Sequence, residues 1–308
     1  MTNNPIKTYR TEAFRQAHIE PEKLLQPGFE QFFIVRVEDM IRRMKLPVPP
    51  TRTDASTLIF LIEGEAVMSI GSETYTIRQH ECLVVPAGQV FSFESGVDQN
   101  RGYLCNFHRD FLLGSPVPGS RRHEFEFLSV WGNPRISFGP EAAAVLRPLL
   151  DRMLREYSAR ALANADLLQA YLRALLCEID LVYQPLVDSA PTAAVHLVQR
   201  FRELLAAHFR TQQLVADYAA RLCVSPNHLT KVVKAATGKS PTKWIAEAVV
   251  LEAKVLLHQS ALSVGEVAGE VGLADASYFS RLFKKHAGLT PLAFRHRIEK
   301  SGNRPHPS

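Results

Sequence analysis

The chain has 308 residues, of which 46% are hydrophobic and 22% charged, and this balance is typical of a globular protein of about two domains. The longest apolar runs, residues 58–62 and 82–86, are far too short to cross a bilayer, and the first residues lack the apolar core of a signal peptide. Four scattered Cys fit free thiols, so we expect a cytoplasmic protein with no membrane partner. From His196 onward, 16 Lys and Arg stand against 8 Asp and Glu, which favours a polyanion-binding module in the last third.

Short strands are predicted between about residues 29 and 107. Glu63-Gly64-Glu65 and Gly71-Ser72 mark tight turns between runs of alternating and β-branched residues. The strands are expected at residues 32–37, 57–62, 66–70, 74–78, 82–85, 90–93 and 102–107. Many short strands separated by tight turns predict a small antiparallel barrel.

Helical periodicity replaces this pattern after Gly139-Pro140. Residues 142–159 and 165–183 each carry a wide apolar stripe, which is expected either to close a dimer or to pack on the barrel of the same chain. Residues 184–192 contain two prolines and no periodicity, as a linker does. Helical patterns resume near Val195 and continue to about Glu299, and residues 301–308 are expected to be disordered.

The last third of the chain contains one pattern twice. The run HLTKVVK at 228–234, followed by TGKSP at 237–241, aligns without a gap with YFSRLFK at 278–284 and AGLTP at 287–291. Each copy predicts a helix with one apolar face and one basic face, ended by Gly and followed by Pro. Two such helices held at a fixed separation are suited to read two successive major grooves of DNA.

Both copies carry the start and stop signals of a helix. Ser225 is the expected N-cap before Pro226, Asp275 is the expected N-cap of the second copy, and Gly238 is expected to end the first helix in the left-handed conformation. The residues expected to face inward are Leu229, Val232, Val233 and Ala236 in the first copy, and Phe279, Leu282, Phe283 and His286 in the second.

The opposite faces carry residue types that read DNA. Arg281 can donate two parallel hydrogen bonds to guanine, and Asn227 can pair with adenine in the same two-bonded way. The expected base-reading residues are Asn227, Thr230, Lys231, Ser277, Ser280 and Arg281, and the expected phosphate contacts are Lys234, Lys284 and Lys285. A helix over residues 242–258, about 25 Å long, places the two readers about one turn of DNA apart.

The run SYFSRLFKK at 277–285, with GLTP at 288–291 and Arg295, resembles the signature of the AraC/XylS-type transcriptional regulators over residues 197–298. The resemblance implies that the first helix of each unit braces a second helix in the major groove, that the six residues above contact bases, and that RNA polymerase is a partner. Two features depart from the family. Its connecting helix usually carries several arginines, whereas residues 248–251 are apolar, and Gly265 and Gly269 within a helix cost up to about 1 kcal/mol each, which predicts a softer second unit.

The strand region resembles the cupin-like effector domains found ahead of this DNA-binding module. Pro86-Ala87-Gly88 is similar to part of the second cupin motif, and Glu63-Gly64-Glu65 to the turn after the first. Enzymatic cupins hold a metal with two His and a Glu in the first motif and a His in the second. Residues 50–54 contain no His, and Phe91 stands at the place of the second-motif His, so neither a metal nor another cofactor is expected.

A metal-free barrel has an interior that can hold one small molecule. Arg36, Arg52, Glu63 and Arg101 are candidate polar anchors for an effector, or else solvated strand residues. From the resemblance alone, the N-terminal arm, residues 1 to about 28, is expected to fold over the barrel and report its occupancy.

Together these observations predict an α+β fold. A cupin-like antiparallel β-barrel with following helices occupies residues 1–183 and serves effector binding and dimerisation, a linker spans 184–192, and an all-α domain of two helix-turn-helix units joined by a helix spans 193–300. The leading hypothesis is a nucleoid-associated, effector-controlled activator of transcription that is no enzyme and binds double-stranded DNA as a homodimer. The alternatives are a metal-dependent cupin enzyme tethered to a DNA-binding module, and a DNA-binding protein whose barrel is only a dimerisation scaffold.

Overall fold

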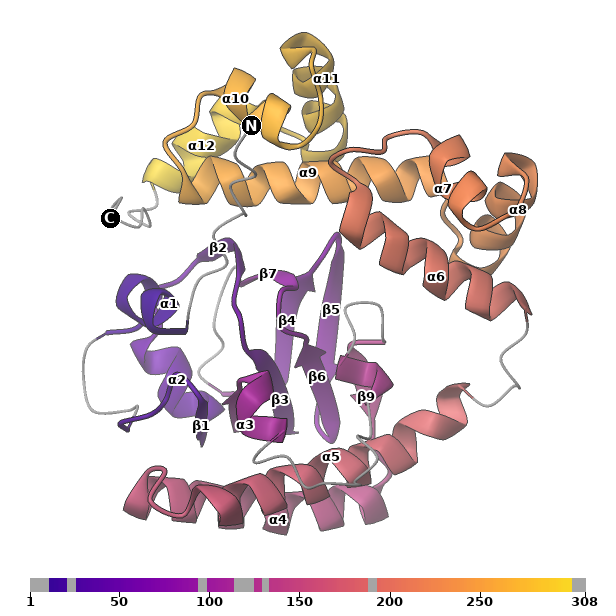
Figure 1. Cartoon of the computed structure of the whole chain (residues 1–308). Coiled ribbons are helices and arrows are strands. Elements are labelled where there is room, and N and C mark those ends of the chain that lie inside the picture. The colour runs from indigo at the N-terminus through magenta and orange to yellow at the C-terminus, as the bar shows by residue number, and fades with distance from the viewer. Residues whose placement is uncertain are drawn as a thin grey trace. The chain divides into compact units, whose positions relative to one another are not determined.

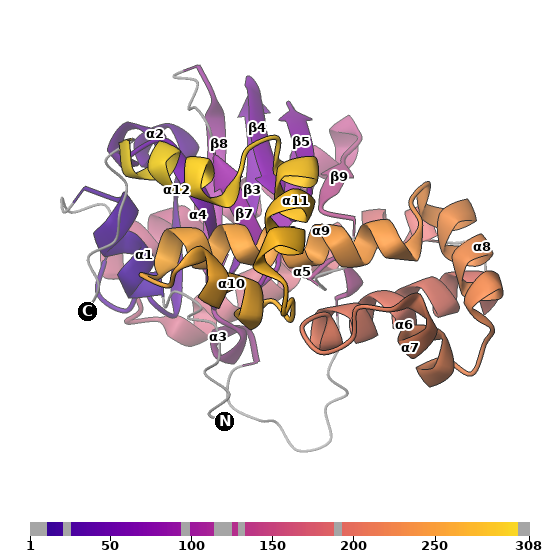
Figure 2. The same cartoon turned by 90° about the horizontal axis from the view of Figure 1, so that it is seen from above.

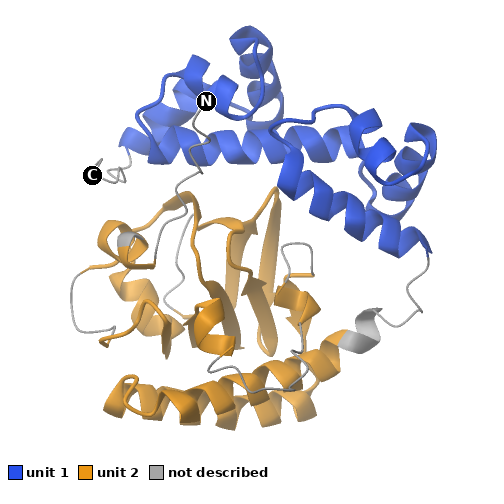
Figure 3. Ribbon diagram, viewed as in Figure 1, with its two compact units in different colours: residues 1–6, 187–308 blue, residues 7–186 orange. Residues whose placement is uncertain are grey.

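A computed structural model describes residues 11–20, 26–93, 99–113, 125–128, 133–187 and 193–300 of the chain. The chain divides into two compact units, one that takes in residues 7–186 and one that takes in residues 187–308 (Figure 3). The expected linker core at 188–192, the tail at 301–308 and most of the N-terminal arm lie outside the described residues. Each unit is considered by itself below.

The strands of the first unit form two antiparallel sheets (Figure 1). One sheet has five strands in the order β1 (Phe32–Arg36), β8 (Arg101–Phe107), β3 (Ser56–Glu63), β6 (Glu81–Val85) and β9 (Arg135–Ser137). The other has four strands in the order β2 (Val48–Arg52), β7 (Val90–Phe93), β4 (Glu65–Ile70) and β5 (Glu73–Arg78). All seven expected strands are therefore present, and the antiparallel architecture is confirmed.

Two strands were not expected from the sequence. Strand β2 contains Pro49 and Pro50, which cannot donate backbone hydrogen bonds, and it lies at the edge of its sheet, where this loss is tolerated. Strand β9 is only three residues long and pairs with β6, opposite Glu81, Cys82 and Leu83.

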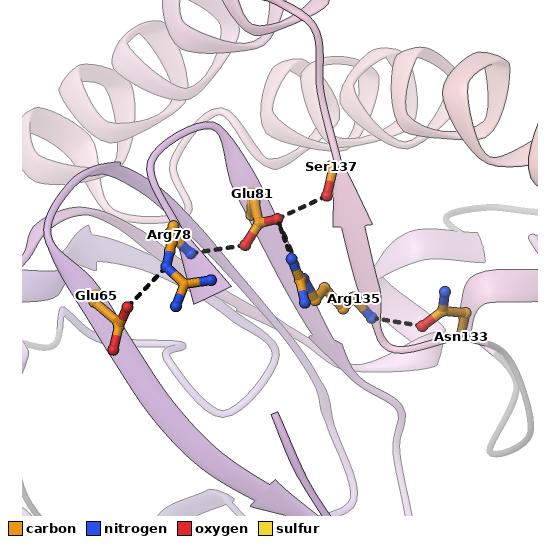
Figure 4. A network of polar contacts seen from close by, with 6 residues as sticks. All are labelled: Glu65, Arg78, Glu81, Asn133, Arg135 and Ser137. Carbon is orange, nitrogen blue, oxygen red and sulfur yellow. Dashed lines mark hydrogen bonds and ion pairs between the residues drawn. The ribbon is translucent and has the colours of Figure 1, made fainter. Parts of the chain in front are cut away.

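A polar network attaches β9 to the sheet (Figure 4). The Glu81 carboxylate accepts hydrogen bonds from the Arg135 guanidinium and the Ser137 hydroxyl, both at 2.7 Å, and from the backbone N–H of Arg78 at 2.8 Å. Burial raises the pKa of Glu81, but the hydrogen bonds from Arg135, Ser137 and Arg78 outweigh burial and hold the pKa below its ordinary value. Glu81 is 8% exposed, and these donors favour the charged form of its carboxylate.

Helices complete the first unit. They are α1 (Thr11–His18), α2 (Val37–Arg43), α3 (Arg109–Leu113), the 3₁₀ turn η1 (Glu126–Leu128), α4 (Pro140–Arg160) and α5 (Ala165–Val187). The two long helices confirm the expected pair, but α5 continues through Pro185 to Val187, so the segment expected to begin a linker at Gln184 is helical. Among the described residues, no helix combines the length and the apolar composition needed to span a membrane.

The apolar stripes of α4 and α5 are buried within their own unit. The Tyr157 ring on α4 contacts Phe32 of β1 at 5.8 Å between centroids, and the Tyr183 ring on α5 contacts Phe127 at 5.6 Å. The stripe residues with less than 2% exposure are Leu146, Leu150, Met153, Leu168, Leu172, Leu175, Leu176 and Ile179. Of the two expected uses of these stripes, the described structure therefore shows packing within the chain.

The second unit consists of helices. They are α6 (Ala193–His208), α7 (Val215–Arg221), α8 (Pro226–Thr237), α9 (Pro241–Gln259), α10 (Val264–Glu270), α11 (Ala276–Ala287) and α12 (Pro291–Lys300). Figure 2 shows α9 running through the unit, with α7 and α8 near one end and α10 and α11 farther along it. Two helix-turn-helix units joined by a helix are thus present as expected.

Helix α9 belongs to both hydrophobic cores of this unit. Its first half contributes Ile245 to the core around α6, α7 and α8, and its second half contributes Val249 and Ala253 to the core around α10, α11 and α12. The apolar stretch at residues 248–251, which departs from the arginine-rich helix of the resembling family, therefore contributes to the packing of both units. At 1.5 Å per residue, α9 is about 28 Å long.

Candidate nucleic-acid interface and ligand cavity

Helices α8 and α11 begin as the sequence predicts. The Ser225 hydroxyl accepts a hydrogen bond from the backbone N–H of His228 at 3.2 Å. The Asp275 carboxylate accepts two such bonds, from Ser277 at 2.8 Å and from Tyr278 at 3.2 Å. Both N-caps are therefore confirmed, and each satisfies backbone donors that a helix start leaves unpaired.

The two helices also end alike. Gly238 and Gly288 both have left-handed backbone conformations, with φ of 72° and 75°, and their N–H groups bond to the carbonyls of Lys234 and Lys284. Gly is favoured there because other residues pay a steric cost at positive φ. Since start and end are matched, the helices have equal length and lie 50 residues apart in the chain.

The inward faces hold the helices on their cores. Leu229 and Val233 of α8 are fully buried, as are Phe279 and Phe283 of α11. Val232 is half-buried, like Leu282 in the second copy, and packs against its core as expected, whereas Ala236 is exposed. Ala236 lies near the end of α8, and its small side chain reaches neither core.

The outward faces carry the nine predicted DNA contacts, and the structure places them on two equivalent surfaces. Thr230 and Ser280 are half-buried. The exposed residues are Asn227, Lys231, Lys234, Ser277, Arg281, Lys284 and Lys285. No side chain in this set makes a hydrogen bond or ion pair with another described residue. These side chains are therefore available to a partner molecule. We call the two surfaces the α8 face and the α11 face.

Contacts between the two helix-turn-helix units fix these faces relative to each other. The Gln213 side-chain amide, in the loop after α6, donates to the carbonyls of Phe209 at 3.1 Å and Val271 at 3.0 Å, and so reaches the turn of the second unit. Gly272 in that turn, at φ 84°, lies so close to the Arg210 carbonyl that any side chain would overlap with it. The two readers thus form one packed domain.

An apolar cavity lies in the first unit, covered by α1. Its volume is ≈ 40 Å³, which is room for about three water molecules. The apolar lining comes from both sheets and from the N-terminal helices: Phe14, Ile19, Phe33, Met40, Met44, Met68, Val85, Phe91, Phe93 and Leu104. The polar lining is Thr11, Arg15, Thr53, Thr57 and Asn106. The cavity is small and shaped for an apolar guest.

Two groups of polar side chains lie at the cavity. Arg15 is bound to Glu12 by hydrogen bonds of 2.8 and 3.3 Å, and its guanidinium lies 5.1 Å from the centre of the Phe29 ring. Asn106 on β8 donates to the Thr57 hydroxyl on β3 at 2.9 Å. That bond uses the Nδ2 atom of the Asn106 amide. The amide oxygen, Oδ1, is buried and has no hydrogen-bond partner among the described residues.

The four expected effector anchors are not among the residues that line this cavity. Glu63 is exposed at the end of β3, and Arg101 lies opposite it on β8 and donates to the Asn100 carbonyl. Arg52 lies on the edge strand β2.

Arg36 has a structural contact instead. Its guanidinium pairs with the Asp151 carboxylate of α4 at 2.8 Å and lies 4.3 Å from the centre of the Tyr103 ring. The Tyr103 hydroxyl donates to the same Asp151 oxygen at 2.6 Å. Burial, and then the bond to Asp151, raises the pKa of Tyr103. Arg36 therefore joins β1 to α4.

The cavity residues were missed because they come together only through long-range pairing. Thr57 and Asn106 are 49 residues apart and are paired across β3 and β8. One signal was present in the sequence: Asn106 interrupts an otherwise apolar strand, and Asn is depleted in strands. A buried Asn in a strand is a candidate for a binding or structural role.

Phe91 lies in the cavity wall, at the place of the second-motif His of enzymatic cupins. Its ring contacts Phe14 of α1 and Phe93 of β7, both at 5.8 Å between centroids. Within the described ranges, no three His, Cys, Asp or Glu side chains gather closely enough to hold a metal ion. The position thus provides an apolar surface in the described structure.

Two family descriptions match this chain. The "AraC-like ligand binding domain" matches residues 44–176, and the "Helix-turn-helix domain" matches residues 218–297. The first range lies within the sheet unit that holds the cavity, and the second within the unit that carries the α8 and α11 faces. The fold and sites therefore define a transcriptional regulator with a ligand-binding domain and a DNA-binding domain.

Known proteins are similar to this chain over most of its length. The arabinose operon regulatory protein of Salmonella typhimurium is 24% identical over 76% of this chain and 81% of its own length. The HTH-type transcriptional activator RhaR of Pectobacterium carotovorum is 26% identical over 87% of this chain and 94% of its own length. A structure of ToxT from Vibrio cholerae matches with 13% identity and a TM-score of 0.41, over 86% of this chain and 97% of that one. The chain belongs to the AraC-type transcriptional regulators.

Proposed function

We propose that this regulator reads DNA sequence with the α8 and α11 faces and activates transcription under the control of a small molecule bound in the sheet unit. The observation that carries the proposal is the match between the two faces. Positions 227 and 277, 231 and 281, and 234 and 284 are exposed in both copies, and positions 230 and 280 are half-buried in both. Two equivalent polar surfaces, whose side chains make no hydrogen bond or ion pair with other described residues, are suited to two successive major grooves.

The roles within each face follow from residue chemistry. Arg281 and Lys231 donate to guanine, Asn227 pairs with adenine, and the small side chains Thr230, Ser277 and Ser280 let the helices approach base edges. Lys234, Lys284 and Lys285 bind phosphates and add affinity that falls with salt. Base contacts supply the specificity, and phosphate contacts supply the register.

Replacement of Arg281 by Ala tests the base-reading role. Purified full-length protein selects from fragmented genomic DNA at physiological salt, and the enriched fragments are sequenced for the wild type and for Arg281→Ala. We expect wild-type sites with two motifs about one helical turn apart, and loss of preference at one base pair, by about 1–3 kcal/mol, in the variant. Lys284→Ala is the matched control, since it should weaken all sequences equally and lower the salt slope by about 1. Equal weakening of all sequences by Arg281→Ala contradicts the proposal.

The effector's route to the DNA-binding unit begins at α1. Thr11 of α1 is held by Asp54 through its N–H and its hydroxyl, both at 3.2 Å, and Phe14 and Arg15 line the cavity. A guest larger than the cavity must move α1, so occupancy changes how this helix docks. We infer that this movement is the signal, and that it passes through the junction after α5 to the reader.

Assembly and location complete the proposal. Because the stripes of α4 and α5 are buried in the chain, a homodimer would use their outer surface, where Val145 is 46% and Leu181 66% exposed. Activation requires contact with RNA polymerase at the promoter, hence a place on the cytoplasmic nucleoid. The similar proteins are regulators rather than enzymes, which supports a sensing role for the cavity.

A further inference from the structure

The Asn106 side chain in the cavity wall has a buried acceptor atom that a ligand could pair with. This atom bears on the chemistry of the effector. Asn106 is 5% exposed, lines the cavity, and leaves Oδ1 without a partner among the described residues. A buried acceptor that is left unpaired lowers stability, because it has lost its hydrogen bonds to water. A guest that donates a hydrogen bond to this atom recovers that loss.

A hydroxyl is the group that fits the Asn106–Thr57 pair. The Thr57 hydroxyl accepts from Asn106 Nδ2 and retains its own hydrogen, so it can donate to the oxygen of a guest while the guest donates to Asn106 Oδ1. If the amide is turned over, Thr57 donates to Oδ1 and Nδ2 faces the guest, and the guest's oxygen still accepts. An oxygen that both donates and accepts is satisfied in either orientation.

The rest of the cavity favours an uncharged guest. Among the described residues that line the cavity, Arg15 alone is charged, and it shares two hydrogen bonds with the Glu12 carboxylate. The remaining surface is aromatic and aliphatic, and the thioethers of Met40, Met44 and Met68 can rearrange around a ring or short chain. Because Glu12 already holds the Arg15 guanidinium, and this pair is 30% and 42% exposed, the apolar part of the cavity offers an anion no buried positive charge.

We propose that the effector is a small, uncharged, mostly apolar alcohol or phenol whose hydroxyl binds between Asn106 and Thr57, beneath α1. This inference rests on the proposed sensing role of the cavity and names its ligand class. The apolar body of the ligand contacts Phe14 and Phe91, so a bound ligand reaches the helix that covers the cavity.

Phenol and toluene test the proposal, because they have nearly the same shape and only phenol has a hydroxyl. Full-length protein labelled with ¹³C at the methionine methyl groups is titrated with each and followed by NMR. Met40, Met44 and Met68 report the cavity, and Met153, buried in α4 outside the lining, reports nonspecific changes. A purely apolar cavity prefers toluene, whereas the proposed site prefers phenol by at least about tenfold.

Two variants separate the hydroxyl site from general loosening. Asn106→Leu keeps the volume and removes the polar pair, so toluene should then bind at least as well as phenol. Thr57→Val should reduce the preference for phenol in the same direction. Unchanged Met153 signals and unchanged DNA selection show that a variant is folded.

Three other outcomes would contradict the proposal that the effector is an uncharged alcohol or phenol. Toluene binding as tightly as phenol in the wild type would mean that Asn106 does not select the guest. Tighter binding of benzoate than of phenol would indicate an anionic effector at Arg15, and no shift at the cavity methionines with any of the three up to on the order of 10 mM would exclude such small rings altogether. The NMR titration contains no DNA, so it tests the ligand class independently of the DNA selection. A negative result in one experiment therefore does not affect the conclusion from the other.

Discussion

The two helix-turn-helix units have the same internal plan but carry different residue types at equivalent outward positions. Helices α8 and α11 lie 50 residues apart at both ends, and the buried residues at corresponding positions are Leu229 and Phe279, and Val233 and Phe283. The outward residues differ: Lys231 corresponds to Arg281. The fold therefore constrains the buried pair and the caps, while the reading surface is free to diverge. Two different half-sites are the expected consequence.

The turns of the two units differ as well. Three residues separate α7 from the N-cap Ser225, whereas four separate α10 from Asp275. Cys223 adopts φ of 55° in the first turn, and Gly272 adopts φ of 84° in the second. The first turn therefore holds a side chain in a conformation that favours Gly, while the second uses Gly where backbone of the first unit approaches.

The largest expected difference between the units is at these turns. Gly272→Ala places a methyl group against the Arg210 carbonyl at positive φ, and we expect it to lower the free energy of unfolding by about 3 kcal/mol or more. Cys223→Gly, the matched change in the first turn, should leave stability unchanged or raise it by up to about 1 kcal/mol. Urea unfolding of the full chain, followed by Trp244 fluorescence in a Trp131→Phe background, measures both. Equal effects would remove the distinction between the turns.

The N-caps give the next difference. Asp275 accepts two backbone hydrogen bonds and Ser225 accepts one, so Asp275→Ala should cost about 1–2 kcal/mol and Ser225→Ala about 1 kcal/mol or less. The same unfolding measurement applies, with Asp275→Asn and Ser225→Thr as conservative controls that retain a cap. A larger loss of stability for Ser225→Ala than for Asp275→Ala would contradict the expectation that the second N-cap contributes more.

The two units also differ in how their glycines affect stability. Gly269 lies in α10 with no positive φ and open space around it, so Gly269→Ala should stabilise the second unit by about 0.4–1 kcal/mol. Gly238→Ala, also in open space but at φ 72°, should destabilise the first unit by about 1 kcal/mol. Proton exchange of backbone amides in each unit locates the change. Destabilisation by Gly269→Ala would mean that the helix interior needs Gly there.

The sequence predicted the helix-turn-helix unit better than the cavity of the sheet unit, because the signals for helix caps act over only a few residues. Ser225, Pro226 and Gly238 act on the backbone within a few residues, so their effect can be read locally, and the structure confirms it. The capping box of Ser263 and Glu266 was not anticipated, although it offsets the Gly residues of α10.

The cavity depends on contacts between distant segments. Strand β2 was hidden by its prolines, and α1 covers the cavity although its sequence shows no sign of its partner sheets. The charged residues chosen as anchors follow the rule that polar groups bind ligands, but Arg36 forms an ion pair with α4 instead. Only the pairing of β3 with β8 brings Thr57 to Asn106.

The smallest expected difference concerns pH, because His286 in the second unit corresponds to Ala236 in the first. Burial lowers the pKa of His286 below its ordinary 6.5; Glu247 opposes this, and Lys285, Lys243 and Lys254 add to it. The unfolded chain therefore binds more protons than the folded one as the pH falls through 6.5, and the second unit loses stability in that direction.

His286→Ala should remove this part of the pH dependence. Between about pH 7.5 and about pH 5.5, the wild type should lose more free energy of unfolding than the variant, while Ala236→His, which adds the same ring at an exposed position of the first unit, should add no comparable loss. Parallel pH profiles for the wild type and His286→Ala would show that the ring titrates alike in both states. The second unit would then resemble the first in its response to pH, and the two would differ only in their caps, turns and reading residues.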